Sequence, residues 1–217
     1  IFGVNPQVAV VLMTNYPYAI GWMQENVPAI LMNATGSQDM GTGLASALFG
    51  DSVPAGRLPM TWYLSDEDLP PMEDYDLIRN PRTYRYFDKP VLYPFGFGLS
   101  YSSFRYDSLK TEICTDKQGN FEGLLTQVSV TNIGQVTADE VVQLYVKRIS
   151  PSETVHPLRR LIGFERLHDL KPGETRTVTL KTVPTDLAIY MEEKGERLVE
   201  AGEYLIYAGG SSLREEV

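Results

Sequence analysis

The sequence predicts an α/β segment followed by an all-β sandwich. Two continuous apolar runs of strand type, each followed by a helical pattern, lie within roughly the first 50 residues. Beyond about residue 103, hydrophobic and polar residues instead alternate with a period of two, which is the pattern of half-buried strands. Clusters of glycine, proline and asparagine separate these alternating segments, as in antiparallel sheets. The chain therefore changes fold class once along its length.

The α/β pattern begins with a strand at Val8–Met13, an apolar, β-branched run typical of a parallel sheet that is covered on both faces. Tyr18–Glu25 is predicted to form a short helix, and Pro28–Met32 a second strand of the same kind. Asn33–Gln38 then provides a strand-to-helix turn, in which a glycine permits the sharp reversal. These elements indicate part of a parallel sheet.

A second helix follows this turn. Asp39 lies in its first turn, where the helix dipole favours an anion, and Gly50 is placed to end it. An apolar stripe at i, i+4 and i+8 marks the face that packs, formed by Met40, Leu44 and Leu48. The spacing predicts one buried face along this helix.

Two strands and two helices cannot close a hydrophobic core, because both faces of each strand are apolar and need neighbours. Residues 1–64 are therefore expected to be the C-terminal portion of a larger α/β sandwich domain, with further polypeptide before Ile1. Residues 65–102 are aperiodic, acidic at first, and rich in proline and aromatic residues. Loops of this length wrap a surface or serve a site, so this segment is predicted to be a connector.

Residues 103–217 are predicted to form a two-sheet sandwich of the immunoglobulin or fibronectin-III type. About seven short strands separated by turns over roughly 114 residues match the size of that fold. The predicted strands are Phe104–Thr111, Gln127–Asn132, Glu140–Val146, Leu158–Phe164, Thr175–Leu180, Leu187–Met191 and Gly202–Tyr207.

Composition excludes several classes of function. The net charge of −9 and the pI near 4.8 argue against nucleic acid as a partner, because phosphate binding needs a basic face. The longest apolar run, Val8–Met13, is far shorter than the roughly 20 residues of a membrane span. The single cysteine, Cys114, excludes an internal disulfide. His156 and His168 are isolated in the sequence, and no spacing predicts a metal site or a cofactor.

Several motifs in a fixed order resemble the C-terminal half of glycoside hydrolase family 3, and together they cover nearly the whole chain. In the first part these motifs are Asn26–Leu31, Ala45–Asp51, Pro54–Thr61, Arg82–Phe87 and Leu92–Tyr101. In the sandwich they are Val130–Asn132, Asp139–Tyr145, Leu161–Glu165, Leu170–Glu174 and Ala201–Tyr204. The resemblance implies the end of the family's α/β sandwich domain and its complete fibronectin type III-like domain.

The resemblance also implies an activity for a longer parent protein. Members of the family are retaining exo-acting β-glycosidases, which use two carboxyl groups about 5 Å apart. The family's nucleophile is an aspartate on an N-terminal barrel, and its acid/base is typically a glutamate upstream of the region that matches here. No residue of this chain matches either motif, so the chain alone is expected to be inactive and to meet an oligosaccharide substrate only through the missing N-terminal part.

Two segments leave the substrate open between xylosides and glucosides. Met60–Tyr63 is similar to the β-xylosidase-like branch of the family, whereas Gly96–Tyr101 is shared with the β-glucosidases. The turn Asn33–Gln38 departs from the family's usual Trp-x-Pro-Gly-Gln type of turn, which weakens any inference about the contacts of that loop.

Gln38 and Asp39 are the candidate residues adjacent to a site. They follow a strand at its C-terminal end, which is where open α/β sheets place ligand contacts. A purely structural role as a helix cap explains Asp39 equally well. Arg57 could hold a ligand carboxylate with two hydrogen bonds, but an internal salt bridge is the favoured interpretation.

The remaining candidates favour structural roles. Two groups of acidic residues are expected in surface loops. The first group is consecutive and consists of Asp66, Glu67 and Asp68. The second group consists of Glu73, Asp74 and Asp76, and a sugar subsite is the alternative for it. Aromatic residues could stack on sugars, but packing between the two domains is favoured; they are Trp62, Tyr63, Tyr84, Tyr86 and Phe87.

Two rival interpretations keep the fold and change the function. A non-catalytic carbohydrate-binding module would suit the sandwich equally well, and so would a structural interaction domain. The unpaired strand faces of residues 1–64 count against the binding module, because a free-standing module would not carry part of a sheet. The same faces allow a homodimer. An exposed apolar patch on the sandwich would favour the structural interaction domain.

Overall fold

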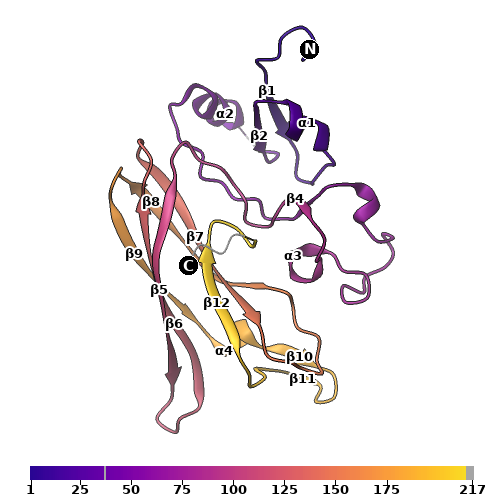
Figure 1. Cartoon of the computed structure of the whole chain (residues 1–217), viewed down its shortest axis with the longest axis vertical. Coiled ribbons are helices and arrows are strands. Elements are labelled where there is room, and N and C mark those ends of the chain that lie inside the picture. Colours follow the sequence, from indigo (N-terminus) through magenta and orange to yellow (C-terminus); the bar gives the residue numbers. More distant parts are fainter. Residues whose placement is uncertain (37, 214–217) are drawn as a thin grey trace.

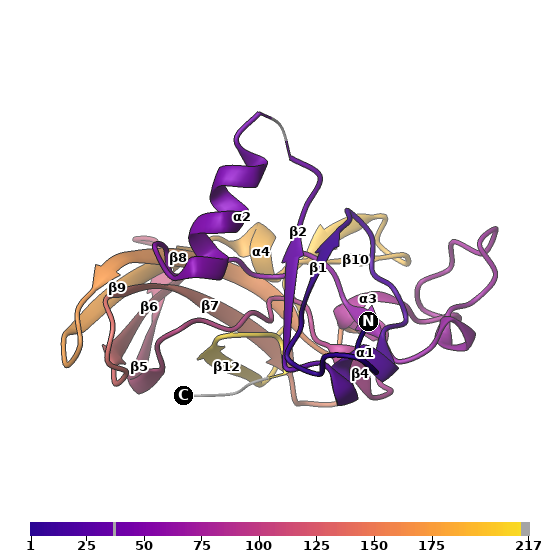
Figure 2. The same ribbon diagram turned by 90° about the horizontal axis from the view of Figure 1, so that it is seen from above.

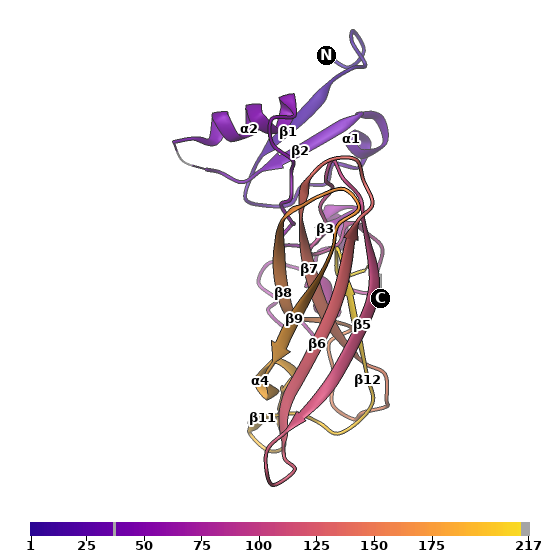
Figure 3. The ribbon, with the colours of Figure 1, turned by 90° about the vertical axis from the view of Figure 1, so that its left-hand side faces the viewer.

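The computed structural model describes residues 1–36 and 38–213. Figures 1 and 3 show the α/β segment at one end of an elongated β-sandwich, with the connector running between them. The fold class is therefore the predicted one, an α/β segment followed by an all-β sandwich. None of the helices in the described part of the chain combines the length and apolar character needed to cross a bilayer.

The α/β segment holds two parallel strands and two helices. Strand β1 (Ala9–Met13) pairs in parallel with β2 (Ala29–Asn33), and α1 (Gly21–Asn26) connects them. Helix α2 (Met40–Phe49) follows and projects away from the sandwich (Figure 2). It ends at Gly50, whose φ of 83° is a left-handed conformation that glycine adopts without strain.

One helix boundary and one cap differ from the prediction. Helix α1 begins at Gly21, not at Tyr18, and residues 18–20 belong to no helix or strand. Asp39 occupies the N-cap position of α2, but its side chain makes no capping hydrogen bond. Asp39 therefore lies one residue before the first turn in which it was predicted, and its side chain does not cap the helix.

The connector forms short elements of its own. A two-stranded antiparallel sheet joins β3 (Trp62–Tyr63) to β4 (Val91–Tyr93), so the two ends of the loop meet. Between them lie the 3-10 helix η1 (Asp66–Asp68) and the single-turn helix α3 (Thr83–Tyr86). The long aperiodic segment is thus closed at its base by backbone hydrogen bonds.

Two three-stranded antiparallel sheets build the sandwich. One has the order β5–β6–β9, with β5 (Phe104–Thr115), β6 (Phe121–Asn132) and β9 (Thr175–Thr182). The other has the order β12–β7–β8, with β7 (Ala138–Arg148), β8 (Arg160–Leu170) and β12 (Tyr204–Gly209). A hairpin of β10 (Ile189–Met191) and β11 (Glu196–Leu198) adds a small third sheet.

Alternate residues of the two main sheets point inward and make one core. Its fully buried members include Val128, Val142, Leu144 and Leu170. Each buried side chain of this size contributes about 1.5–3 kcal/mol relative to an exposed one. The period-two pattern of the sequence is therefore the pattern of this core.

The segment Leu187–Met191 is only partly the predicted strand. Residues Pro184–Leu187 form the short helix α4, and the strand β10 begins at Ile189. Pro184 occupies the first helical turn, where its fixed φ and missing N–H are tolerated. The predicted strand was two residues too long because Leu187 is buried from a helix instead.

Candidate functional site

Gln38 and Asp39 lie beyond the C-terminal end of β2, at the edge predicted for ligand contacts. The adjoining turn is tied to the loop after β1, because the Thr35 N–H donates to Asn15 Oδ1 over 2.9 Å. Both side chains are exposed, and neither forms a hydrogen bond with any described residue. They are available for contacts outside this chain, and their role stays a prediction.

An apolar groove of about 570 Å³ separates the α/β segment from the connector. Its walls come from both parts of the chain, among them Leu12, Ile30, Leu48, Tyr93, Phe97 and Leu99. Burial in this groove raises the pKa of Tyr93, whose hydroxyl donates to Gln24 on α1. Among the described residues, no Asp or Glu lines this groove.

Arg57 forms a buried ion pair with the sandwich. Its Nη2 lies 2.6 Å from Glu140 Oε2 on β7, and the two side chains are 10% and 3% exposed. The Tyr106 hydroxyl on β5 donates to the other carboxylate oxygen over 2.8 Å. The internal salt bridge predicted for Arg57 is confirmed, and it links the segment before the connector to both sheets.

Tyr84 on α3 fixes the connector to the sandwich through its ring and its hydroxyl. Its ring stacks on Phe95 with centroids 4.2 Å apart and meets the Tyr145 ring of β7 edge to face at 6.3 Å. Its hydroxyl accepts a hydrogen bond from the Leu161 N–H of β8 over 3.2 Å. The packing role predicted for this aromatic residue is confirmed.

The other aromatic candidates also pack within the protein. Trp62 is 1% exposed and lies 5.9 Å from the Tyr93 ring. Tyr63 and Phe87 meet edge to face at 4.9 Å, while Tyr86 is covered by the guanidinium of Arg85 at 5.7 Å. These contacts agree with the packing role predicted for these aromatic residues.

The connector also reaches the sandwich through its backbone. Gln143 on β7 is buried, and its Nε2 donates to the carbonyl oxygens of Gly96 and Gly210 over 3.1 and 2.8 Å. Gly96 has a φ of 81°, and a Cβ there would lie 2.0 Å from Gln143 Oε1. Only glycine therefore fits at position 96.

The acidic candidates hold their own loops together. Asp76 accepts hydrogen bonds from the N–H groups of Arg79 and Ile78, which lower the pKa of its carboxyl. Asp74 accepts from the Asp76 N–H and from the Asn80 side chain. A carboxyl whose pKa is lowered in this way, as that of Asp76 is, stays ionised and does not act as a general acid.

The first acidic group is equally structural. Asp66 and Glu67 are exposed on η1, and Asp68 pairs with Lys89 at 3.5 Å. Glu73 is exposed on the neighbouring loop. The predicted surface location of these carboxylates is confirmed, while the sugar subsite considered as an alternative gains no support from their geometry.

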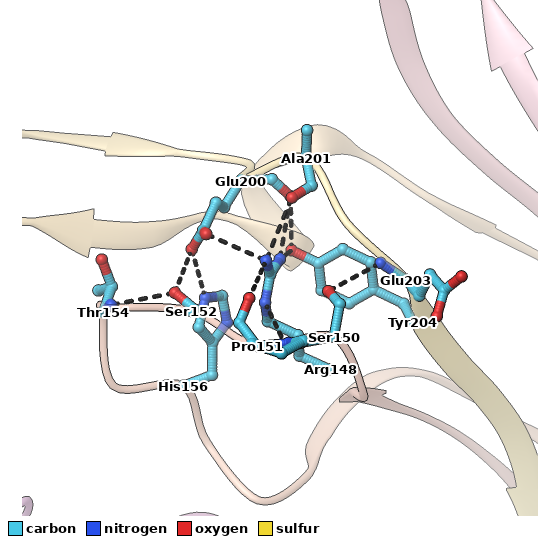
Figure 4. Close-up of polar contacts among 10 residues, drawn as sticks. All are labelled: Arg148, Ser150, Pro151, Ser152, Thr154, His156, Glu200, Ala201, Glu203 and Tyr204. Carbon is cyan, nitrogen blue, oxygen red and sulfur yellow. Dashed lines mark hydrogen bonds and ion pairs between the residues drawn. The ribbon is translucent and has the colours of Figure 1, made fainter.

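A cluster around Glu200 was not found from the sequence. One carboxylate oxygen lies 2.8 Å from both His156 Nε2 and Ser152 Oγ, and the other lies 3.0 Å from Arg148 Nη2 (Figure 4). Arg148 also donates to the Tyr204 hydroxyl over 3.0 Å. These contacts tie the loop after β7 to the strand β12.

The hydrogen bond from His156, followed by the one from Ser152, lowers the pKa of the Glu200 carboxyl. The histidine is isolated in sequence but not in space, because Glu200 lies 44 positions away. His168 likewise lies 3.1 Å from Asp139 on β7. Neither histidine belongs to a metal site: across the described ranges, no three His, Cys, Asp or Glu side chains gather closely enough to hold an ion.

Comparison with known families divides the chain in two. Residues 1–101 match the model of the glycosyl hydrolase family 3 C-terminal domain, and residues 140–212 match that of the fibronectin type III-like domain. The first match contains all the motifs of the first part, and the second contains those of the sandwich except Val130–Asn132 and the first residue of Asp139–Tyr145.

Similar proteins include enzymes for two kinds of sugar. The chain is 40% identical over 195 residues to a xylan 1,4-β-xylosidase of Xylanibacter ruminicola, covering 89% of this chain and 21% of that protein. It is 33% identical over 221 residues to a β-glucosidase of Kluyveromyces marxianus, covering 96% of this chain and 25% of that protein.

Solved structures agree with these sequence matches. The crystal structure of the Kluyveromyces marxianus β-glucosidase with glucose superposes with a TM-score of 0.88 at 31% identity, covering 99% of this chain and 26% of that one. For β-glucosidase 3B of Thermotoga neapolitana with glucose, the TM-score is 0.84 at 31% identity, covering 97% and 30%. The chain thus spans between a fifth and a third of its relatives. It belongs to glycoside hydrolase family 3 and contains sequence of the C-terminal α/β domain and of the fibronectin type III-like domain of that family.

Proposed function

We propose that this chain is the C-terminal scaffold of a retaining exo-β-glycosidase that removes terminal β-linked xylose or glucose from oligosaccharides. The observation that carries the proposal is that β-xylosidases and β-glucosidases align with 89% or more of the chain at 33–40% identity. Catalysis by retention needs a nucleophile and an acid/base about 5 Å apart. We place both on polypeptide upstream of Ile1.

In this proposal the chain has three parts. Residues 1–64 complete the sheet that positions the acid/base loop, residues 65–102 connect the domains, and residues 103–217 form the supporting sandwich. The buried pair of Arg57 and Glu140 fixes the segment before the connector to the sandwich, and Tyr84, which stacks on Phe95, fixes the connector itself. A rigid support matters because small displacements of a catalytic group reduce the rate strongly.

Gln38 and Asp39 are proposed to lie beside the active site of the whole enzyme. Their support is their place beyond the C-terminal end of a parallel strand and their exposure. In the full-length enzyme, Gln38→Ala and Asp39→Asn are expected to raise KM or lower kcat for a nitrophenyl β-xyloside or β-glucoside. Glu67→Gln, on the exposed η1 helix, is the control. Kinetics unchanged in both variants would remove these residues from the site.

The proposal as a whole is tested by activity. The chain of residues 1–217 should not hydrolyse either nitrophenyl glycoside, whereas the chain extended upstream through an N-terminal barrel should. Turnover by residues 1–217 above background would place the catalytic carboxylates within this chain and overturn the proposal. An inactive extended chain, with a folded barrel, would overturn the assigned activity.

Residues 1–217 alone are also proposed to form a homodimer through the free edges of β1 and β2, which have no other partner strand among the described residues. Sedimentation at several concentrations measures the mass. A monomer at all concentrations would refute the dimer and leave the glycosidase proposal unaffected.

A further inference from the structure

The loop between β7 and β8, residues 149–159, forms a strap between the sandwich and the connector. At its start, the Ile149 N–H donates to the carbonyl of Glu203, the residue before β12, over 3.0 Å. Near its end, the Leu158 N–H donates to the Arg85 carbonyl of α3 over 2.7 Å. The strap therefore contacts two parts of the chain that do not touch its own strands through the sheet, and nothing in the proposed function uses it.

The Glu200 carboxylate holds the middle of the strap. One of its oxygens lies 2.8 Å from both Ser152 Oγ and His156 Nε2, which belong to the strap (Figure 4). The other oxygen lies 3.0 Å from Nη2 of Arg148, at the end of β7. Within the part of the chain that the structure describes, no other residue outside the strap forms a hydrogen bond with residues 152–157. One carboxylate therefore fixes this part of the strap.

The groups around this carboxylate favour its ionised form. The hydrogen bond from His156, then the one from Ser152, lowers the pKa of Glu200, and the charge of Arg148 acts in the same direction. The Tyr204 hydroxyl of β12 donates to the backbone carbonyl of Glu200 over 2.7 Å, so it orders this residue without adding a charge. Because Arg148 and His156 are only 5% and 10% exposed, both partners are held in place.

Helix α3, which the other end of the strap contacts, begins with a strained residue. Thr83 has a φ of 66°, a left-handed conformation that is a true outlier for a β-branched side chain. Its N–H donates to the Tyr63 hydroxyl over 2.9 Å, and its carbonyl accepts from the Phe87 N–H over 2.9 Å. Strained residues of this kind persist only where the surrounding structure holds them. The shape of α3 therefore depends on its neighbours.

The two contacts of the strap are close together along the chain. His156, which bonds to Glu200, and Leu158, which bonds to Arg85, are separated by Pro157 alone. The ring of a proline fixes its φ and restricts the residue before it, so this segment is stiff. A displacement of His156 is therefore passed on to Leu158 and to α3.

From these observations we infer that residues 149–159 hold the strained helix α3 in place and that the charged Glu200 carboxylate is the latch of this strap. The latch is closed while the carboxylate is ionised, because a charged acceptor forms stronger hydrogen bonds than a neutral one. When the charge is lost, the strap loosens, the hydrogen bond between Leu158 and Arg85 opens more often, and Thr83 relaxes. The geometry of the connector thus responds to acid through a residue that lies outside it.

The test measures hydrogen exchange of single amides by NMR in the 15N-labelled chain of residues 1–217. At neutral pH, Glu200→Gln should speed exchange at Leu158 and Phe87 about tenfold, the low end for hydrogen bonds to a charged group, because the Glu200 side chain is 23% exposed. Exchange at Val128 in the core of β6 should not change, since a local opening leaves the core intact. As pH falls below the ordinary glutamate pKa of 4.5 and through the lowered folded value, the wild-type rates should approach those of the variant at the same pH.

Glu203→Gln is the matched control. It removes the same charge three residues away, and the Glu203 side chain points away from the cluster (Figure 4), so exchange at Leu158 should stay unchanged. A second variant, Thr83→Gly, tests the strain, because glycine adopts a positive φ without cost. Combined with Glu200→Gln, it should leave Phe87 better protected than Glu200→Gln does alone.

Four results would overturn the inference. They are unchanged exchange at Leu158 in Glu200→Gln, an equal increase in Glu203→Gln, an equal increase at Val128, which would mean that Glu200 acts on the whole sandwich, and no gain in protection at Phe87 from Thr83→Gly. Because hydrolysis is not measured, each result is independent of the proposed glycosidase activity.

Discussion

The buried ion pair between Arg57 and Glu140 gives the sharpest prediction about stability. Replacing Arg57 by methionine keeps most of the side-chain volume and leaves the Glu140 carboxylate buried with the Tyr106 hydroxyl. Breaking a buried pair by removing one partner costs about 3–5 kcal/mol, because the remaining carboxylate loses a charge-assisted hydrogen bond in a desolvated place. Since both side chains are at least 90% buried, solvent does not screen this loss.

The size of the effect makes it measurable by thermal unfolding. For a protein of this size, 1 kcal/mol corresponds to about 2–4 °C in Tm, so Arg57→Met should lower Tm by roughly 6–20 °C. The control is Arg105→Met, which removes a guanidinium that is 60% exposed and pairs with Asp107. Exposed pairs contribute about 0–1 kcal/mol, so Tm should change little.

A double variant separates the ion pair from the loss of packing. Combining Arg57→Met with Glu140→Leu removes the buried carboxylate as well. The double variant should therefore be more stable than Arg57→Met alone. Calorimetry or circular dichroism on the three variants completes the test. If the unfolding free energy of Arg57→Met lies within about 0.5 kcal/mol of that of Arg105→Met, which is about the scatter of surface substitutions, the pair does not hold the segment before the connector to the sandwich and the reasoning fails.

Three other perturbations follow from local geometry. Gly96→Ala should destabilise the chain by more than Gly173→Ala, because both glycines have positive φ but only at position 96 would a Cβ meet Gln143; equal losses in chemical denaturation would contradict this clash. The lowered pKa of Glu200 means that its contribution to stability is complete above the ordinary glutamate pKa of 4.5 and is lost as pH falls through the lower folded value. Glu200→Gln should therefore flatten the acid limb of Tm against pH, and an unchanged limb would show that the contact with His156 does not matter. Amides of β1 and β2 should exchange with deuterium faster than those of β6 and β7, and equal protection would indicate that the two-strand sheet is stable alone.

Much of the fold follows from local sequence patterns. The alternation in Thr175–Leu180 corresponds to β9, and the apolar run at Val8–Met13 corresponds to β1. Element ends were less accurate, since α1 begins three residues after the predicted start and Leu187 belongs to a helical turn. Periodicity identifies which face is buried, but the end of an element depends on neighbours that are distant in sequence.

The candidate sites were predictable to different degrees. Gln38 and Asp39 could be placed at a sheet edge, because a strand-to-helix turn has one location relative to its strand. The internal pairing of Arg57 was expected, but its partner was not, because Glu140 lies 83 positions away on β7. The Glu200 cluster gave no signal in the sequence, because its members have no characteristic spacing.

The sequence by itself determined the two fold classes, the family and the positions of most strands, because these depend on periodicity and on short motifs. Only the tertiary structure decided which distant side chains meet: Arg57 with Glu140, and His156 with Glu200. The physical reason is that such contacts depend on strand register and on the packing of one element against another, which residues neighbouring in sequence do not encode.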